Sequence, residues 1–310
     1  MVNRRGMVFG VAAYVLWGLF PLYWPLLKPA NAVEIVSHRI MWSLVAIVVI
    51  LAFGRNWSWI RTLDRRKLWM LALASVLISV NWCVYIYAVN TGKTIEGSLG
   101  YFINPLISIL FGVLIFRERL RRWQWAAVGL GTAAVAVLSV DYGRLPYIAL
   151  VLACSFGVYG LLKKFASMPS AEGLAVETTV MFVPAAAVSI VMQANGTAAF
   201  GHHGAGNMAL LAAAGVVTAV PLLLFNASAV RVPMSTLGLL QYLAPILQFL
   251  IGLLVQHEEM PASRWAGFLL VWAALIVLTV DGLLTGRRTR RLARQTPAPA
   301  LADPIAEPAT

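Results

Sequence analysis

Long apolar runs separated by short polar or charged segments repeat along the whole chain. A helix needs about 20 apolar residues to cross the hydrocarbon core of a bilayer, and ten runs come near that length. The pattern therefore predicts an all-α membrane protein with ten transmembrane helices. We place them, to within several residues at each end, at 7–27, 35–53, 68–90, 97–116, 123–140, 146–162, 175–194, 207–229, 234–256 and 264–284.

The composition agrees with this class of protein. Of the 310 residues, 60% are hydrophobic and 12% charged, with a mean hydropathy of +0.80, whereas soluble domains are about one quarter charged. The net charge of +12 is not the mark of a nucleic-acid binder, because Lys and Arg cluster in short loops between the apolar runs. Cys83 and Cys154 both lie in apolar runs and read as packed small side chains. We expect no metal ion, no cofactor and no nucleic acid.

The distribution of Lys and Arg predicts the orientation in the membrane. With the N-terminus in the cytoplasm, 19 of the 24 Lys and Arg residues fall in inside segments, 4 fall outside, and Arg39 lies within a span. The positive-inside rule then places both termini in the cytoplasm and favours an even number of spans. A cleaved signal peptide is the alternative reading of the start, but the first run is too long and carries Trp17 and Pro21. We expect a disordered cytoplasmic tail over 286–310 because it is rich in Arg and then in Pro and Ala.

The chain repeats itself after 140 residues. Without a gap, 14 of 37 positions are identical between 105–141 and 245–281. Two five-helix halves follow, over 7–141 and 146–283, and because five is odd the second half enters the membrane from the opposite side. Such inverted repeats are typical of secondary transporters, which bind substrate near the midplane between the halves. The matched positions include Pro105 with Pro245, Glu118 with Glu258, Trp125 with Trp265 and Asp141 with Asp281.

Polar side chains near the predicted midplane are candidates for a substrate cavity. Pro105 and Pro245 each remove a backbone donor inside a span, which a membrane tolerates only where protein or water satisfies the freed carbonyl. Amides and aromatic rings beside them suit a mixed apolar and polar solute. The alternative is that the prolines only kink their helices and the polar groups bond neighbouring helices. The candidate cavity residues are Asn81, Trp82, Tyr85, Tyr101, Asn104, Asn226, Gln241 and Gln248.

Ionisable side chains within spans are candidates for gating or proton coupling. Glu34 and His38 are one helical turn apart at the predicted outer end of the second span, and Arg39 follows them. The sequence leaves two partners open for Arg39, Glu34 or an anionic group of the substrate. Glu177 occupies the position in the second half that the repeat relates to Glu34. We expect Glu34 and Glu177 to belong to equivalent outer and inner gates, with Glu34 or His38 exchanging a proton. The alternative is that these charges reach the interface and are solvated there.

Several short motifs recur together in one known family of membrane proteins. They are His38-Arg39 with Trp42-Ser43, Asn81-Trp82, Ala88-Val89-Asn90, Ser98–Leu106, and Ser235–Gly238 with Gln241-Tyr242 and Pro245. With these motifs the chain resembles the EamA family of the drug/metabolite transporter superfamily, and more closely its RarD-like branch of bacterial chloramphenicol-sensitivity proteins. The resemblance covers about residues 6–285 and implies a ten-helix permease for small organic solutes in the bacterial inner membrane.

The expected function is therefore movement of metabolites or drugs across the cytoplasmic membrane by alternating access, with secondary active export. The expected partners are a small-molecule substrate and membrane lipid, with protons as one coupling option; the oligomeric state does not follow from the sequence. A passive channel or lipid scramblase on the same fold stays open as an alternative. An intramembrane enzyme is disfavoured because the sequence shows no catalytic motif and only four His residues.

Overall fold

The computed structural model describes residues 4–54, 57–117, 119–168 and 170–295. Within these ranges every regular element is a helix, which confirms the all-α expectation. The elements are α1 (Arg4–Gly18), α2 (Phe20–Tyr23), η1 (Trp24–Leu27), α3 (Ala32–Gly54), η2 (Ser58–Thr62), α4 (Arg65–Asn90), α5 (Thr94–Phe116), α6 (Arg122–Tyr142), α7 (Tyr147–Ala166), α8 (Ser170–Ala194), α9 (Gly204–Ala229), α10 (Met234–Leu240), α11 (Leu243–Leu254) and α12 (Ala262–Gln295).

Nine stretches of the described chain are long and apolar enough to cross a membrane, or ten if one bent pair is counted as a single span. The bent pair is Arg4–Gly18 with Phe20–Leu27, at an angle of 40°. The bend precedes Pro21, which cannot donate a backbone hydrogen bond to the preceding turn. The chain is thus a multi-pass membrane protein by length and apolar character, with its first predicted span broken rather than straight.

Two other predicted elements differ in the structure. The predicted ninth span is interrupted between α10 and α11, because Pro245 leaves the carbonyl of Gln241 without its helical donor. The predicted tail begins later than expected, since α12 continues as helix to Gln295. Residues 296–310 of that tail lie outside the described ranges.

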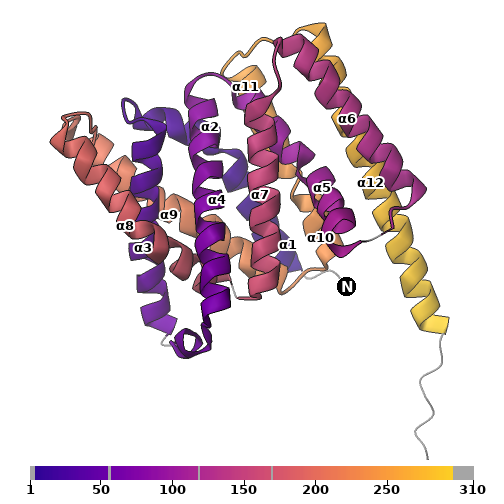
Figure 1. Cartoon of the computed structure of the whole chain (residues 1–310), viewed down its shortest axis with the longest axis horizontal. Helices are drawn as coiled ribbons and strands as arrows, with labels where there is room; N and C mark the ends of the chain where they lie inside the picture. The colour runs from indigo at the N-terminus through magenta and orange to yellow at the C-terminus, as the bar shows by residue number, and fades with distance from the viewer. Residues whose placement is uncertain (1–3, 55–56, 118, 169, 296–310) are drawn as a thin grey trace, which may run out of the picture.

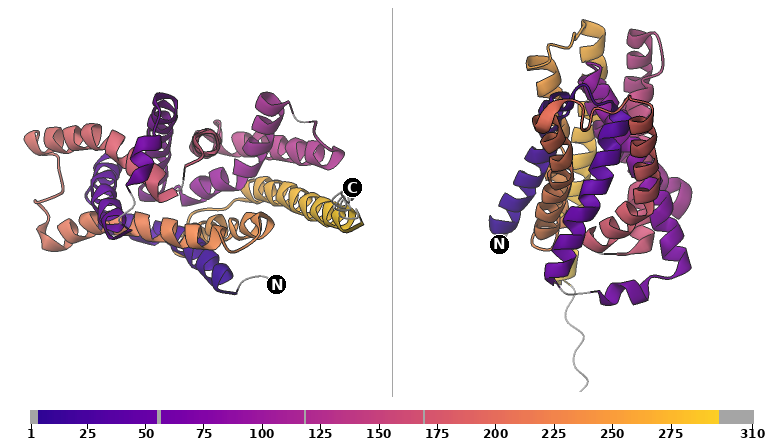
Figure 2. Two further views of the ribbon diagram at one scale, coloured as in Figure 1. Left: turned by 90° about the horizontal axis from the view of Figure 1, so that it is seen from below. Right: turned by 90° about the vertical axis from the view of Figure 1, so that its left-hand side faces the viewer.

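The helices form a flattened bundle that is longer than it is deep (Figure 1; Figure 2). Helix α8 lies at one edge of the view in Figure 1, and α6 with α12 lies at the other. Between them α3 packs on α8 and α9, α4 packs on α7, α5 packs on α7 and α11, and α1 packs on α9 and α11. Most of these contacts join the first half of the chain to the second.

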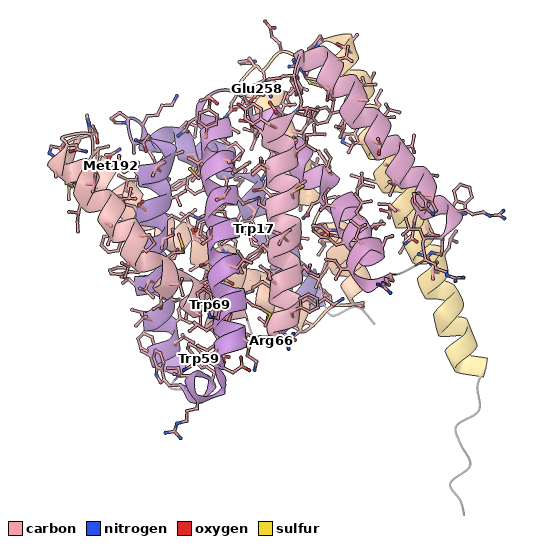
Figure 3. All side chains as sticks on the ribbon, in the orientation of Figure 1. Trp17, Trp59, Arg66, Trp69, Met192 and Glu258 are labelled. Carbon is pink, nitrogen blue, oxygen red and sulfur yellow. The ribbon has the colours of Figure 1, made fainter. Side chains whose placement is uncertain are left out.

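Glu258 and Arg66 mark the two ends of this bundle (Figure 3). We call them the Glu258 end and the Arg66 end. The connections that follow η1, α4, α6, α8 and α11 meet at the Glu258 end, where they exchange several hydrogen bonds. The Arg66 end carries the start of α4, with Asp64 capping that helix by accepting from the Lys67 N–H at 2.7 Å.

Helices α6 and α12 run antiparallel and are joined at both ends by ion pairs. At the Glu258 end, Arg264 Nε lies 2.9 Å from Asp141 Oδ2. At the opposite end, Arg121 Nη2 lies 2.6 Å from Asp281 Oδ2. Asp141 and Asp281 occupy matched positions in the 140-residue repeat. Each aspartate therefore holds an arginine that belongs to the other half of the chain.

Two more helix pairs have the same antiparallel relationship. The C-terminal part of α3 packs on the start of α8, where Ile47 meets Leu174 and Ala175. The start of α5 lies against the end of α11, where a Cβ added to Gly252 would be 2.8 Å from Ile95 Cγ1. In each pair, the two helices hold corresponding places in the two halves.

Buried side chains form two main clusters on either side of α7. One contains Trp24 and Tyr85 and joins η1, α3, α4, α7, α8 and α9. The other contains Phe102, Phe249 and Phe268 and joins α5, α6, α7, α11 and α12. The first cluster holds the buried charges described next.

Candidate functional site

Glu34 links α3 to the α8–α9 loop at the Glu258 end, and we call this contact the Glu34 clasp. Glu34, fully buried in the first turn of α3, accepts hydrogen bonds through Oε1 from the N–H groups of Ala199 at 2.7 Å and Phe200 at 2.9 Å. Two successive backbone N–H groups form an anion-binding site. The second carboxylate oxygen, Oε2, has no hydrogen-bond partner. The α8–α9 loop is thereby fixed onto α3.

His38 lies beneath the same loop. Its ring stacks on Phe200 with the centroids 4.4 Å apart, and 6% of the residue is exposed. Its Nδ1 has no hydrogen-bond partner. Glu34 and His38 therefore meet the α8–α9 loop together, one through a carboxylate and the other through a ring face.

Glu258 makes a second link at this end. Its carboxylate accepts from the N–H of Thr94 at 2.5 Å and from the N–H of Ile95 at 3.0 Å, and so caps α5. Thr94 also bonds the Gln256 side chain. Burial raises the pKa of the Glu258 carboxyl, while the hydrogen bonds from Ile95 and Thr94 act in the opposite direction.

Arg39 is a buried cation surrounded by aromatic rings. It follows His38 on α3, five residues after Glu34, and is 3% exposed. Its guanidinium carbon lies 3.9 Å from the ring centroid of Trp82, 5.2 Å from that of Trp24 and 5.5 Å from that of Phe20. Nε donates to the Thr218 hydroxyl on α9 at 2.7 Å. No ion pair in the described ranges includes Arg39, so the sequence-level option of an Arg39–Glu34 pair is not the arrangement seen.

A polar bridge connects three helices beside Arg39. The Asn81 amide on α4 donates to the Leu152 carbonyl and the Ser155 hydroxyl on α7, both at 2.9 Å. Its oxygen accepts from the Tyr101 hydroxyl on α5 at 3.1 Å. Tyr85 packs edge-on against Tyr101 at 5.4 Å, and its own hydroxyl has no partner. Asn81 is thus fully engaged between helices, whereas Tyr85 keeps a buried polar group unsatisfied.

The proline-flanking amides lie in different surroundings. Asn104 on α5 is half-buried and its Oδ1 has no partner, while α5 stays continuous through Pro105. Gln248 is buried and donates to the Trp17 carbonyl at 3.2 Å. Gln241 lies at the break between α10 and α11 and is exposed, whereas Pro245 and Gln248 are buried. The Asn226 side chain lies outside the described part of the structure.

Glu177 on α8 holds the corresponding place toward the Arg66 end. Its carboxylate pairs with Lys163 Nζ at 2.7 Å and accepts from the Tyr159 hydroxyl at 3.3 Å, both on α7. A small cavity of about 10 Å³ lies between Glu177 and Trp82. That volume suits about one water molecule. Other lining side chains include Ser75, Ser79 and Thr178.

Sequence reasoning missed four members of this arrangement: Phe20, Trp24, Thr218 and Lys163. Pro21 and Pro25 are the sequence signal that could have found Phe20 and Trp24, because prolines in the first span indicate a broken helix whose side chains can face the protein interior. Thr218 lies 179 residues from Arg39, and no local pattern links them. Lys163 entered the sequence analysis only as one of the 19 Lys and Arg residues in inside segments.

Comparison with known proteins gives the family. The profile of the EamA-like transporter family matches residues 4–140. The chain is 54% identical to Protein RarD of Streptomyces exfoliatus, over 99% of this chain and 98% of that protein. It is 46% identical to the uncharacterized transporter YojE of Bacillus subtilis strain 168, over 89% of this chain and 94% of that one.

A solved crystal structure gives independent support for the fold. It superposes with a TM-score of 0.57 at 20% sequence identity, over 92% of this chain and 98% of that chain. At this identity the likeness concerns the fold alone. The family profile and the nearly full-length relatives that are named RarD or transporter show that the chain belongs to the EamA-like transporter family, in its RarD-like branch.

Proposed function

We propose that the protein moves small organic solutes, metabolites or drugs, across the bacterial cytoplasmic membrane by alternating access, as a secondary active exporter. The family supports a membrane transporter. To this family function the proposal adds alternating access as the mechanism, export as the direction of transport, and the bacterial cytoplasmic membrane as the location.

The proposal includes ten spans in two inverted halves, with both termini in the cytoplasm. Counting the bent α1, α2 and η1 as one span gives the tenth. The antiparallel packing of α6 on α12, α3 on α8 and α5 on α11 supports the inversion, because each pair joins corresponding helices of the two halves. The Lys and Arg distribution then makes the Arg66 end cytoplasmic and the Glu258 end external.

One observation carries the mechanism: the two ends of the bundle are closed differently. At the external end, Glu34 binds the α8–α9 loop of the other half. At the cytoplasmic end, its counterpart Glu177 pairs with Lys163 of its own half. Alternating access requires that corresponding groups at the two ends make different contacts at any one time. If Glu34 and Glu177 swap their kinds of contact, the open end of the transporter changes as well.

Glu34 and His38 are the proposed proton-coupling pair. Breaking the Glu34 clasp exposes its carboxylate to the external solution, where it exchanges protons. Asn104, Gln248 and Trp82 are proposed to face the solute on the path between the two gates, with Tyr85 and Tyr101 beside them. Pro105 and Pro245 supply the local backbone freedom that such motion needs.

Solute uptake into inverted membrane vesicles, with and without a pH gradient, tests this function. The panel contains amino acids, nucleosides and amphiphilic drugs. We expect saturable uptake that depends on the gradient in the wild type and loses that dependence in a Glu34→Gln, His38→Gln double variant. Glu259→Gln, an exposed carboxylate in the external loop, is the control and keeps both properties. Uptake without saturation would instead indicate a passive channel or scramblase.

A further inference from the structure

The Arg39 guanidinium is a buried charge without a counter-ion in the described structure. Rings of Phe20, Trp24 and Trp82 surround it, and its hydrogen bond to the Thr218 hydroxyl uses one of its five N–H donors. Aromatic faces attract a cation, but a full charge in a low-dielectric interior is normally paired with an anion. Arg39 lies roughly 10 Å into α3, at 1.5 Å per residue, which is beyond easy reach of bulk water.

Glu34, the carboxylate nearest to Arg39 in sequence, and Glu177, which lines the cavity beside Trp82, both interact with other groups. Glu34 Oε1 binds the α8–α9 loop, and Glu177 binds Lys163. Neither makes an ion pair with Arg39 in the structure. Glu34 Oε2 has no hydrogen-bond partner, but it forms no ion pair with Arg39 in this structure. An anion from outside the described chain would supply the counter-ion that Arg39 lacks.

Two further donors in the same buried cluster also lack acceptors. Trp24 Nε1 and the Tyr85 hydroxyl are unpartnered, in residues that are 0% and 2% exposed. An unsatisfied buried donor is costly. The indole N–H, the phenol O–H and the guanidinium all donate to oxygen. A carboxylate is the kind of group that accepts from each of them, whereas a cationic amine only donates and finds an acceptor here only in the Tyr85 oxygen.

We infer that the solute is an organic anion whose charged group binds Arg39, with its apolar or aromatic body against Trp24, Trp82 and Tyr85. This rests on the proposed transport function and narrows its substrate class. Guanidinium binds a carboxylate through two parallel hydrogen bonds, which also fixes the orientation of the solute. Trp82 also lines the small cavity that reaches Glu177.

Matched solutes in proteoliposomes test the inference. The probes are N-acetylphenylalanine, N-acetylleucine and N-acetyltryptophan, each beside its neutral amide. We expect the wild type to take up the acids at least about tenfold faster than the amides, the discrimination typical of one charge-assisted site. Arg39→Met brings the acids to within about twofold of the amides. Arg39→Lys keeps part of the preference because it keeps the charge.

Lys28→Met is the control, since Lys28 is an exposed cation outside the cluster. It leaves the preference unchanged. Saturable uptake of neutral or cationic solutes only, or acid uptake that Arg39→Met does not alter, overturns the inference and leaves transport standing. Absence of saturable uptake of every probe and of the wider panel overturns the transport function, and the inference with it.

Thermal stability in detergent without solute separates a ligand-binding role from a structural one. A structural Arg39 predicts a lower unfolding midpoint for Arg39→Met. If Arg39 instead lacks a counter-ion until solute binds, Arg39→Met should unfold at a midpoint equal to or above that of the wild type, because the variant removes an uncompensated buried charge. A clear loss of stability in Arg39→Met, matched in Arg39→Lys, would contradict the inference.

Discussion

Glu34 in the first half of the chain accepts a hydrogen bond from the Ala199 N–H in the second half at 2.7 Å. This bond, with its neighbour from Phe200, joins the halves at the proposed external end. A bond to a charged acceptor contributes about 1.5–3 kcal/mol when it is buried. In the proposed mechanism, loss of such a bond would shift the populations of the two states by about tenfold or more.

Replacing Glu34 by Gln should open the external end. The neutral amide is a weaker acceptor for the two N–H groups, so we expect the open population to rise about tenfold or more. A Ser37→Cys reporter, buried on α3, measures this through its rate of reaction with a membrane-impermeant thiol reagent. Cys83 and Cys154 are first replaced by Ala. An unchanged rate in Glu34→Gln would mean that the clasp does not govern access.

Closure at the external end should depend on pH through Glu258. Its pKa is raised in the closed structure, so the closed state binds a proton more readily than a state with Glu258 in water. Closure therefore strengthens as external pH falls through the raised pKa towards the ordinary value of 4.5, and it is weakest above that range. The Ser37→Cys rate, taken relative to a Glu258→Gln variant at each pH, should decrease on acidification. A ratio that is flat or rises would refute this coupling.

The inverted repeat makes a prediction about two matched loop positions. Arg119 and Glu259 are 140 residues apart and both exposed. In the Cys-free background, a Cys at position 119 should react only with reagent on the cytoplasmic side, and a Cys at position 259 only with external reagent. Right-side-out and inverted vesicles provide the two sides. Labelling of both positions from one side would exclude opposite orientation of the halves.

Close helix packing at Gly100 should be required for stability. A Cβ there would lie 2.7 Å from Leu152 Cβ and 2.8 Å from the Ala149 carbonyl oxygen, so α5 and α7 have to separate. We expect Gly100→Ala to destabilise the protein by about 1–3 kcal/mol. Gly129→Ala on α6 is the matched control, because a Cβ there meets nothing within 4 Å. The two variants are compared by thermal unfolding in detergent, and equal midpoints would contradict the packing argument.

The sequence was sufficient for the helical class and for most of the span positions, because apolar runs of membrane length are a local property. It also placed Glu34, His38 and Arg39 together, since all three lie within two turns of one helix. Pro105 and Pro245 show the limit of this reasoning. They occupy matched positions, yet α5 continues through one while the helix breaks before the other.

The surroundings of Arg39 could not be read from local pattern. Its partners Trp24, Trp82 and Thr218 come from three other segments, and they meet only when the halves pack together. For the same reason, the sequence left open whether Arg39 pairs with Glu34. Gln241 and Gln248 are both candidates for the cavity from the sequence, yet Gln241 lies at the helix break and is exposed while Gln248 is buried.

Paired spin labels measure alternating access most directly. In the Cys-free background, one pair replaces Lys28 and His203 at the external end, and another replaces Arg65 and Lys164 at the cytoplasmic end; all four positions are exposed. Each pair joins the first half to the second. On introducing Glu34→Gln, we predict that the external distance lengthens while the cytoplasmic distance shortens. If both distances stay fixed, or both lengthen together, the two ends do not open in alternation and the proposed mechanism is wrong.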